Sequence, residues 1–320
     1  MNPSAKHKRL LYKIAEDYYL KELTQNEIAE RLGLSRIKVS RMLRQARAEK
    51  IVNITLNAPP DLRADLEDAL EQMYDLEEVL IVVSEPSTRQ ALVNDLAVAA
   101  AECLMRRLAD DAVVGVAMGK TMMSVVHALP SRAFPGVKIV QMNGSLGQVV
   151  TLDQSAELAR QMAAKLSAEL HLLHAPGIAA SRQAATVFKQ DPLISATLSL
   201  AARADIAMLS IGRLHPGAPA LQEALMLTGD DMAALEHRGI IGDIALRFID
   251  DHGRHVCTPL DERIIGLQFE ELQKIPCVIA VAGGDEKHEV IRAGLKTGIP
   301  KVLVTDQRTA EFLLLPEGKS

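Results

Sequence analysis

The sequence has no long apolar run and few cysteines. None of its 320 residues lies in a stretch of the roughly 18 apolar residues that a membrane-spanning helix needs, so we expect no membrane partner. The polar, basic residues 1–13 lack the apolar segment of a secretory signal. Cys103, Cys257 and Cys277 are odd in number and show no CxxC spacing, which indicates reduced thiols. These absences favour a cytoplasmic location.

Recognisable catalytic and metal-ligand patterns are also lacking. His171 and His174 are three residues apart on an apparent strand, so they would face opposite sides of a sheet. His252 and His255 flank a turn, and no third ligand is evident. No G-x-S-x-G elbow surrounds a serine. The sequence therefore predicts no catalytic residue, no metal and no cofactor.

The net charge of −5 is unevenly distributed along the chain. Residues 1–50 contain 12 Lys and Arg against 6 Asp and Glu, a net charge of +6. The other 270 residues contain 24 and 35, a net charge of −11. A basic head on an acidic body indicates that only the head meets a polyanion such as DNA.

Residues 24–52, TQNEIAERLGLSRIKVSRMLRQARAEKIV, predict a helix-turn-helix within that basic head. Ala29 falls where the first helix needs a small side chain so that the second helix can cross it closely. Gly33 falls at the turn, where φ > 0 is needed. Ser35 is a natural N-cap for a second helix over about 36–47. The apolar positions expected to form the shared core are Ile28, Leu32, Leu34, Val39 and Met42.

The second helix of this motif would carry the contacts to DNA, because its first turns meet base edges in the major groove. The residues expected to bind double-stranded operator DNA are Gln25, Ser35, Arg36, Ile37, Lys38, Ser40, Arg41 and Arg44. The alternative is a small helical hairpin with a solvated basic face. Core spacing, turn glycine, cap and charge all agree, which favours DNA binding. A preceding helix over 8–20 and a short strand or wing over 51–56 would complete the domain.

Asn57-Ala58-Pro59-Pro60 is the clearest boundary, since two prolines stop regular structure and stiffen a linker. Residues 61–76 then predict an amphipathic helix, with Asp61 as a possible cap, that packs on the following domain or pairs with its copy in a dimer. The expected domains are a helix-turn-helix domain over 1–56, a linker and helix over 57–76, and an effector-binding domain over 77–320.

Strands and helices alternate from Glu78 onward, which predicts a mainly parallel α/β sheet covered on both faces. The expected strands are 79–83, 112–118, 137–142, 170–174, 205–211, 276–282 and 301–305. The expected helices include 88–108, 151–166, 191–204, 287–296 and 307–315. Residues 244–250 and 255–258 flank a turn at 251–253 and predict an inserted hairpin.

Three glycine-containing loops follow expected strands, and open α/β sheets bind ligands outside the carboxyl ends of their strands. Residues 119–122 open a helix whose N-terminal N–H groups suit an anion. Val114 stands where a Walker A motif needs glycine, so ATP is not expected. Residues 143–147 and 283–287 form two similar turns. Together the loops predict a site for a small, anionic, hydroxyl-rich molecule.

The chain resembles the SorC family of bacterial transcriptional regulators, which is sometimes grouped with the DeoR-like sugar regulators. The motifs that carry the resemblance are LTQNEIAERLGLSRIKVSRML, GVAMGKT, VQMNGSLG, DIAMLSIG, GIIGDI, RFIDDHG, RIIGL, IAVAGGDEKHEVIRAGLKTG and VLVTDQRTAEFLL. The resemblance implies an α/β protein with an N-terminal all-α, winged helix-turn-helix domain. Its C-terminal domain would be a Rossmann-like sheet of the NagB/RpiA/CoA-transferase type. Dimers or tetramers that regulate carbohydrate operons are also implied.

The resemblance further implies that the C-terminal domain binds a phosphorylated sugar or a related metabolite as its effector. Carried over by position, the expected effector contacts are Gly119, Lys120, Thr121, Asn143, Gly144, Ser145, Asp261, Gly283, Gly284 and Lys287. Asn143 is not a nucleophilic lysine, so noncovalent binding is expected. The alternative function is a sugar-phosphate isomerase or deaminase with a DNA-binding appendage. The sequence leaves open the sugar, the operator, activation against repression, and dimer against tetramer.

Overall fold

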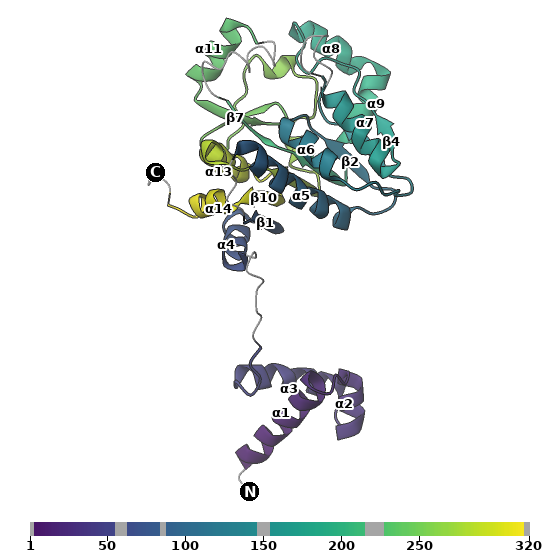
Figure 1. The fold of residues 1–320 in the computed structure, drawn as a ribbon, viewed down its shortest axis with the longest axis vertical. Helices are drawn as coiled ribbons and strands as arrows, with labels where there is room; N and C mark the ends of the chain where they lie inside the picture. The colour runs from purple at the N-terminus through teal and green to yellow at the C-terminus, as the bar shows by residue number, and fades with distance from the viewer. Residues whose placement is uncertain (1–2, 55–62, 84–87, 146–153, 215–226, 317–320) are drawn as a thin grey trace. The chain divides into compact units, whose positions relative to one another are not determined.

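The computed structural model describes residues 3–54, 63–83, 88–145, 154–214 and 227–316 (Figure 1). The chain divides into two compact units, residues 1–59 and 60–320. In the described part of the chain, no helix is long and apolar enough to cross a membrane.

The described residues of the first unit form three helices, α1 (Pro3–Tyr19), α2 (Gln25–Leu32) and α3 (Arg36–Ala48). Thr24 and Glu27 form a reciprocal capping box at the start of α2. Gly33 ends α2 with φ 63°, and the Ser35 hydroxyl accepts the Lys38 N–H at the start of α3. The core of the unit joins all three helices through Leu11, Ile14, Ala15, Ile28, Ala29, Val39, Met42, Leu43 and Ala46. The predicted helix-turn-helix is therefore present, with its expected turn and cap.

The strand or wing predicted over 51–56 is wrong for residues 51–54, which form no strand; residues 55–56 lie outside the described part. Lys50 instead takes a left-handed conformation, φ 56°, and its N–H donates to the Arg47 carbonyl. The Ile51 N–H donates to the Ala46 carbonyl, which completes a Schellman motif. Ile51 and Val52 pack on the helical core, so their apolar character serves the end of α3.

Helix α4 (Ala64–Tyr74) belongs to the second unit and packs against β1 and α14 of that unit, which is the first of the two alternatives for this segment. Leu70 is fully buried in the second unit's core. Glu71 accepts the Val79 N–H at 2.9 Å, and Glu67 accepts the Ile81 N–H at 3.0 Å. The expected cap Asp61 lies outside the described residues, and Arg63 at the N-cap position makes no side-chain capping bond.

The second unit is built on a seven-stranded sheet with the order β1-β10-β9-β5-β2-β3-β4, in which every pair is parallel. Its strands are β1 (Glu78–Val82), β2 (Val113–Val116), β3 (Lys138–Gln141), β4 (Glu169–His171), β5 (Ile206–Leu209), β9 (Cys277–Val281) and β10 (Val302–Asp306). The mainly parallel α/β sheet expected from the sequence is confirmed.

Helices cover both faces of this sheet (Figure 1). One face packs against α5 (Arg89–Arg107), α6 (Lys120–Ala128) and α7 (Gln154–Leu166). The other packs against α4, α9 (Pro192–Ala201), α12 (Phe269–Leu272), α13 (His288–Lys296) and α14 (Gln307–Leu313). Two further helices, α8 (Arg182–Gln190) and α11 (Gly229–His237), were not expected from the sequence.

A small antiparallel sheet of β6 (Ile211–Arg213), β7 (Ile240–Ile244) and β8 (Arg247–Asp250) adjoins α13. The strand expected over 205–211 therefore divides between two sheets. A hairpin that the sequence did not predict joins β7 to β8, with its turn at Ala245 and Leu246, φ 48° and 68°. The turn expected at 251–253 is present after β8. The Asp250 N–H donates to the Arg254 carbonyl, the Val256 N–H donates to the Phe248 carbonyl, and an antiparallel bridge pairs Ile249 with His255, although 255–258 form no regular strand.

Candidate effector and DNA-binding sites

The three loops expected to bind the effector begin at one edge of the main sheet; residues 146–147 of the second loop lie outside the described residues. They follow β2, β3 and β9, and parallel strands place their carboxyl ends together. The strand between β9 and β2 is β5, which ends at Leu209. A Cβ added at Gly119 would lie 2.8 Å from the Ser210 hydroxyl, so a side chain here would displace that hydroxyl where these two loops meet. Lys120 and Thr121 then open α6, which has no side-chain cap.

Asn143 is the most informative residue at this edge. It is 2 % exposed, and within the described residues neither its amide nitrogen nor its amide oxygen has a hydrogen-bond partner. Its neighbours are held by backbone contacts, since the Gly144 N–H donates to the Ile265 carbonyl and the Ser145 N–H to the Ala175 carbonyl. An unsatisfied buried polar group costs about 1–3 kcal/mol. Such a group is expected where a ligand supplies the missing partner.

Lys287 reaches the same edge from the loop after β9, at the end of the short helix η2 (Asp285–Lys287). Its amine donates to the Ile211 carbonyl at 2.9 Å. Burial and the Arg89 charge lower the pKa of Lys287, whereas Asp243 raises it. Burial raises the pKa of the Asp243 carboxyl. The Leu246 N–H and the charge of Lys287 lower the pKa of Asp243 by less than burial raises it. Sequence reasoning missed Asp243, although it stands inside the GIIGDI motif.

The glycines before Lys287 are fitted closely to the end of β10. Gly284 has φ 99°, and its N–H donates to Asp306 Oδ2 at 2.8 Å. A Cβ at Gly283 would lie 2.4 Å from the same oxygen. Asp306 also caps α14 through the Thr309 N–H. The Gly284 amide therefore already has a protein acceptor, and the two glycines shape the loop.

Asp261 has a full set of protein partners. Oδ1 lies 3.0 Å from His255 Nε2 and 3.4 Å from the guanidinium of Arg247, while Oδ2 accepts the Thr258 N–H at 2.8 Å. Burial alone would raise the pKa of Asp261, but His255, the Thr258 N–H and Arg247 hold it below its ordinary value. Arg247 is completely buried and also donates to the Leu267 and Gly266 carbonyls. These contacts give Asp261 a structural role beside the edge.

Two cavities of about 470 Å³ lie near the expected loops. One lies at the ends of β3 and β4 and is lined by Gln141, Ser145, Ala156, Arg160, Leu172, Leu173, His174, Ala175 and Pro176. Of the expected effector contacts, Ser145 lines it. Sequence reasoning had not connected Arg160 and His174, which come from α7 and from the segment after β4, with this position.

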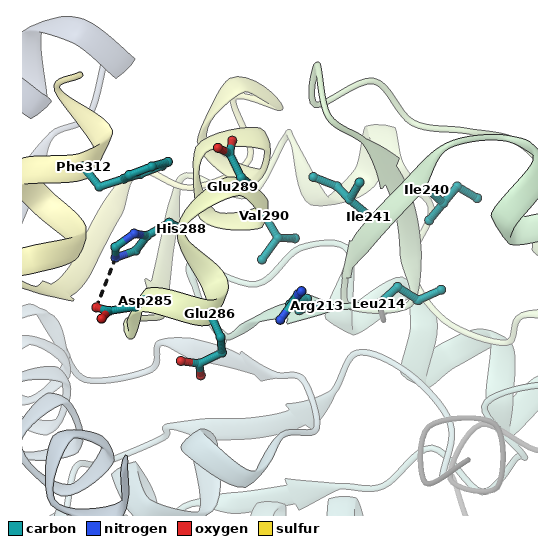
Figure 2. Close-up of a pocket in the computed structure, with 10 residues that line it drawn as sticks. All are labelled: Arg213, Leu214, Ile240, Ile241, Asp285, Glu286, His288, Glu289, Val290 and Phe312. Atoms are coloured by element: carbon teal, nitrogen blue, oxygen red, sulfur yellow. Dashed lines mark ion pairs between the residues drawn. The ribbon is translucent and has the colours of Figure 1, made fainter. Parts of the chain in front are cut away.

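Figure 2 shows the second cavity, which lies beside the loop that carries Lys287. It is lined by Arg213, Leu214, Ile240, Ile241, Asp285, Glu286, His288, Glu289, Val290 and Phe312. Three of these side chains are carboxylates, and the ring of His288 stacks on Phe312 with 4.4 Å between centroids. Arg213 also lines this cavity, and its carboxylates are ion-paired: Asp285 with His288 and Arg308, Glu286 with Arg89, and Glu289 with Arg292.

The outward side of α3 is basic, and four residues on the opposite side of the same helix face the core. Val39, Met42, Leu43 and Ala46 are buried. Arg36, Ile37, Lys38, Arg41 and Arg44 are exposed, whereas Gln25 and Ser40 are partly buried. Ser35 is exposed, and its hydroxyl is already used as the N-cap. The structure therefore presents most of the expected DNA-binding residues on one continuous face.

A buried acid fixes the helices behind that face. Asp17 on α1 is completely buried, and its carboxylate lies 3.2 Å from Arg31 of α2 and 2.9 Å from Lys21. The Tyr19 hydroxyl similarly accepts the Arg47 Nε–H at 2.7 Å and joins α1 to the end of α3. Among the described residues, no group of three His, Cys, Asp or Glu side chains is placed to hold a metal ion.

Both units match known families. Residues 59–315 match the family described as "Putative sugar-binding domain", and residues 13–49 match sigma-70 region 4. The "Deoxyribonucleoside regulator" of Bacillus subtilis is 28 % identical over 306 residues, which cover 96 % of this chain and 97 % of that protein. The "Sorbitol operon regulator" of Klebsiella pneumoniae is 28 % identical and covers 96 % and 98 %.

Solved structures agree with these matches. The full-length sorbitol operon regulator SorC of Klebsiella pneumoniae superposes with a TM-score of 0.73 at 29 % identity, over 96 % of this chain and 99 % of that one. A DeoR family transcriptional regulator from Listeria monocytogenes has a TM-score of 0.71 at 27 % identity and covers 78 % and 99 %.

The fold and the sugar-binding match, which spans most of the chain, place this protein in the sugar-binding domain family. With its helix-turn-helix unit, it is a transcriptional regulator of the SorC family. The similar proteins are named as regulators and not as enzymes, which supports this function over the isomerase or deaminase alternative.

Proposed function

We propose that this regulator binds a phosphorylated sugar noncovalently at the carboxyl edge of its main sheet, and that binding changes its affinity for an operator in the cytoplasm. The observation that carries the proposal is the buried, unpartnered amide of Asn143 on the edge that Lys287 also reaches. The amide suits sugar hydroxyls, since it can both donate and accept. Lys287 and the start of α6 suit a phosphate.

A change in operator affinity requires two sites with a coupling free energy between them, typically about 1–3 kcal/mol or roughly 5- to 150-fold. We propose a homodimer or homotetramer as the coupling device. Paired recognition helices must match half-sites about 34–36 Å apart, so a subunit rearrangement that alters their spacing would change affinity.

The test is to titrate a panel of sugar phosphates and the corresponding free sugars into the full-length protein by calorimetry. The same compounds are then titrated against the protein bound to a selected operator duplex. A sugar phosphate should bind, its free sugar should bind more weakly, and operator affinity should shift at the same concentrations. A sugar phosphate that binds without any shift would refute the coupling.

Two lysines provide a matched pair of variants for this titration. Lys287→Ala should weaken sugar-phosphate binding about tenfold or more, because a hydrogen bond to a charged group contributes roughly 1.5–3 kcal/mol. Lys274→Ala should leave binding unchanged, since Lys274 is exposed and precedes β9 at the opposite end of that strand. Effector-free DNA binding should persist in both. Loss of DNA binding in Lys287→Ala would indicate misfolding and would remove this support.

A further inference from the structure

One apolar side chain lies at the centre of the basic face of α3. Ile37 is 81 % exposed. Each residue turns an α-helix by about 100°, which places Ile37 on the side opposite Val39, Met42, Leu43 and Ala46. Arg41 and Arg44 follow at spacings of four and seven residues and share its line on the helix. Ile37 is therefore the middle of the outward surface.

An apolar side chain is unfavourable in water, and the local fold does not require an isoleucine at position 37. Ile37 lies in the first turn of α3, where its β-branched side chain is a weaker helix former than alanine. It belongs to neither the buried core of the first unit nor the apolar residues packed against that core. Within the described first unit Ile37 therefore has no packing role, and its side chain is free to contact a partner.

The surroundings of Ile37 identify the chemistry of that partner. Arg36, Lys38, Arg41 and Arg44 are all exposed around it. Such a cluster of like charges repels itself unless a polyanion neutralises it, so an apolar protein surface is a poor match and a nucleic acid is a good one. Ile37 would be held against base edges by its charged neighbours.

Only one feature of the base edges suits an isoleucine. In the major groove, guanine, cytosine and adenine present hydrogen-bond donors and acceptors, whereas thymine also presents its C5-methyl group. Isoleucine can neither donate nor accept through its side chain. We infer that Ile37 contacts the C5-methyl group of a thymine in each operator half-site and selects for that base. This inference rests on the proposed operator binding.

The test removes one methyl group at a time from the DNA. Duplexes are selected from a random pool with the full-length protein, and each thymine of the selected sequence is replaced singly by deoxyuridine. At one position per half-site, affinity should fall about fourfold, the equivalent of one buried methyl-sized group. Ile37→Ala should bind the unmodified duplex more weakly and should lose nothing further at that position. Ile37→Val should retain part of the effect.

The thermal unfolding of Ile37→Ala should match the wild type, because the side chain is exposed and makes no core contact. The inference is overturned if deoxyuridine has no effect at any position, or if it has the same effect in Ile37→Ala. It is also overturned if Ile37→Ala changes the oligomeric state while DNA affinity is unchanged. Failure to select any sequence would instead count against operator binding itself.

Discussion

The two units of this regulator present their functional groups in opposite ways. In the first unit the candidate DNA contacts are exposed, carried by one helix and contiguous in the sequence. In the second unit the candidate effector contacts come from loops far apart in the sequence. Asn143 is almost completely buried, and Lys287 is partly buried. A surface for a polyanion needs charge and shape on one element, whereas a pocket for a small molecule needs buried groups assembled by topology.

Within the second unit, we expect the loss of a buried charged side chain to lower the free energy of unfolding far more than the loss of an exposed one. Arg247→Ala should destabilise the second unit by about 3–5 kcal/mol, because it leaves Asp261 and two backbone carbonyls without their buried partner. Denaturant unfolding of the full chain measures this loss. Arg254→Ala is the control and should cost less than about 1 kcal/mol, because Arg254 is exposed and the buried Asp250 keeps the His252 and Arg254 N–H groups as partners. Equal losses of unfolding free energy in the two variants would show that burial of the arginine does not determine the effect.

The exposed arginines of α3 should affect recognition and leave stability unchanged. Arg36→Ala or Arg41→Ala should weaken binding to the selected operator by about 1–3 kcal/mol and relax its sequence preference, if each reads a base edge. Competition between operator and unrelated duplex measures the preference. Lys13→Ala, exposed on α1, is the control. An equal loss on all duplexes would mean that these arginines contact phosphate only.

Acid should weaken the second unit through Asp261. Its partners hold the pKa of Asp261 below the ordinary value, so its contribution is present above the ordinary carboxyl pKa and is lost as pH falls through the lowered one. Unfolding followed from pH 7 to pH 3 should show a steeper acid loss in the wild type than in Asp261→Asn. Parallel curves for the two proteins would show that Asp261 does not carry this dependence.

The smallest expected effect concerns the end of α3. Lys50 holds a left-handed conformation that glycine adopts freely, so Lys50→Gly should stabilise the first unit by about 0.5–1 kcal/mol. Thermal unfolding would measure the gain, with Glu49→Gly as a control that should destabilise, since Glu49 keeps a negative φ. A loss of stability in Lys50→Gly would show that its side chain contributes more than its backbone costs.

The same contrast explains how much the sequence could predict. Gly33 and Ser35 mark the turn and cap of the helix-turn-helix by local rules, and the structure keeps both. The β7–β8 turn was missed because Ala245 and Leu246 are not residues that usually adopt positive φ. The Asp243 carboxylate helps to hold that turn by accepting the Leu246 N–H.

The candidate effector site was predictable only as a set of loops. The alternation of strands and helices indicated that the loops share one edge, because parallel strands end together. The backbone of Asn143 pairs with Gly266, more than 120 residues later, so the burial of its amide cannot be predicted from neighbouring residues. The partner set of Asp261 likewise depends on Arg247, which no local pattern connects to it. Such groups become visible only once the chain is folded.

The helix α4 has one further consequence for how this protein behaves in a cell. Two of its carboxylates, Glu67 and Glu71, accept N–H groups of β1, which is an edge strand of the main sheet. A bare outer strand is a template on which other chains can add, and proteins generally cover or charge such strands. A chain that is cleaved between α4 and β1 and loses α4 would expose the N–H groups of β1 to pairing with other chains. We therefore expect a fragment that begins at residue 77 to precipitate, whereas one that begins at residue 60 should stay monodisperse.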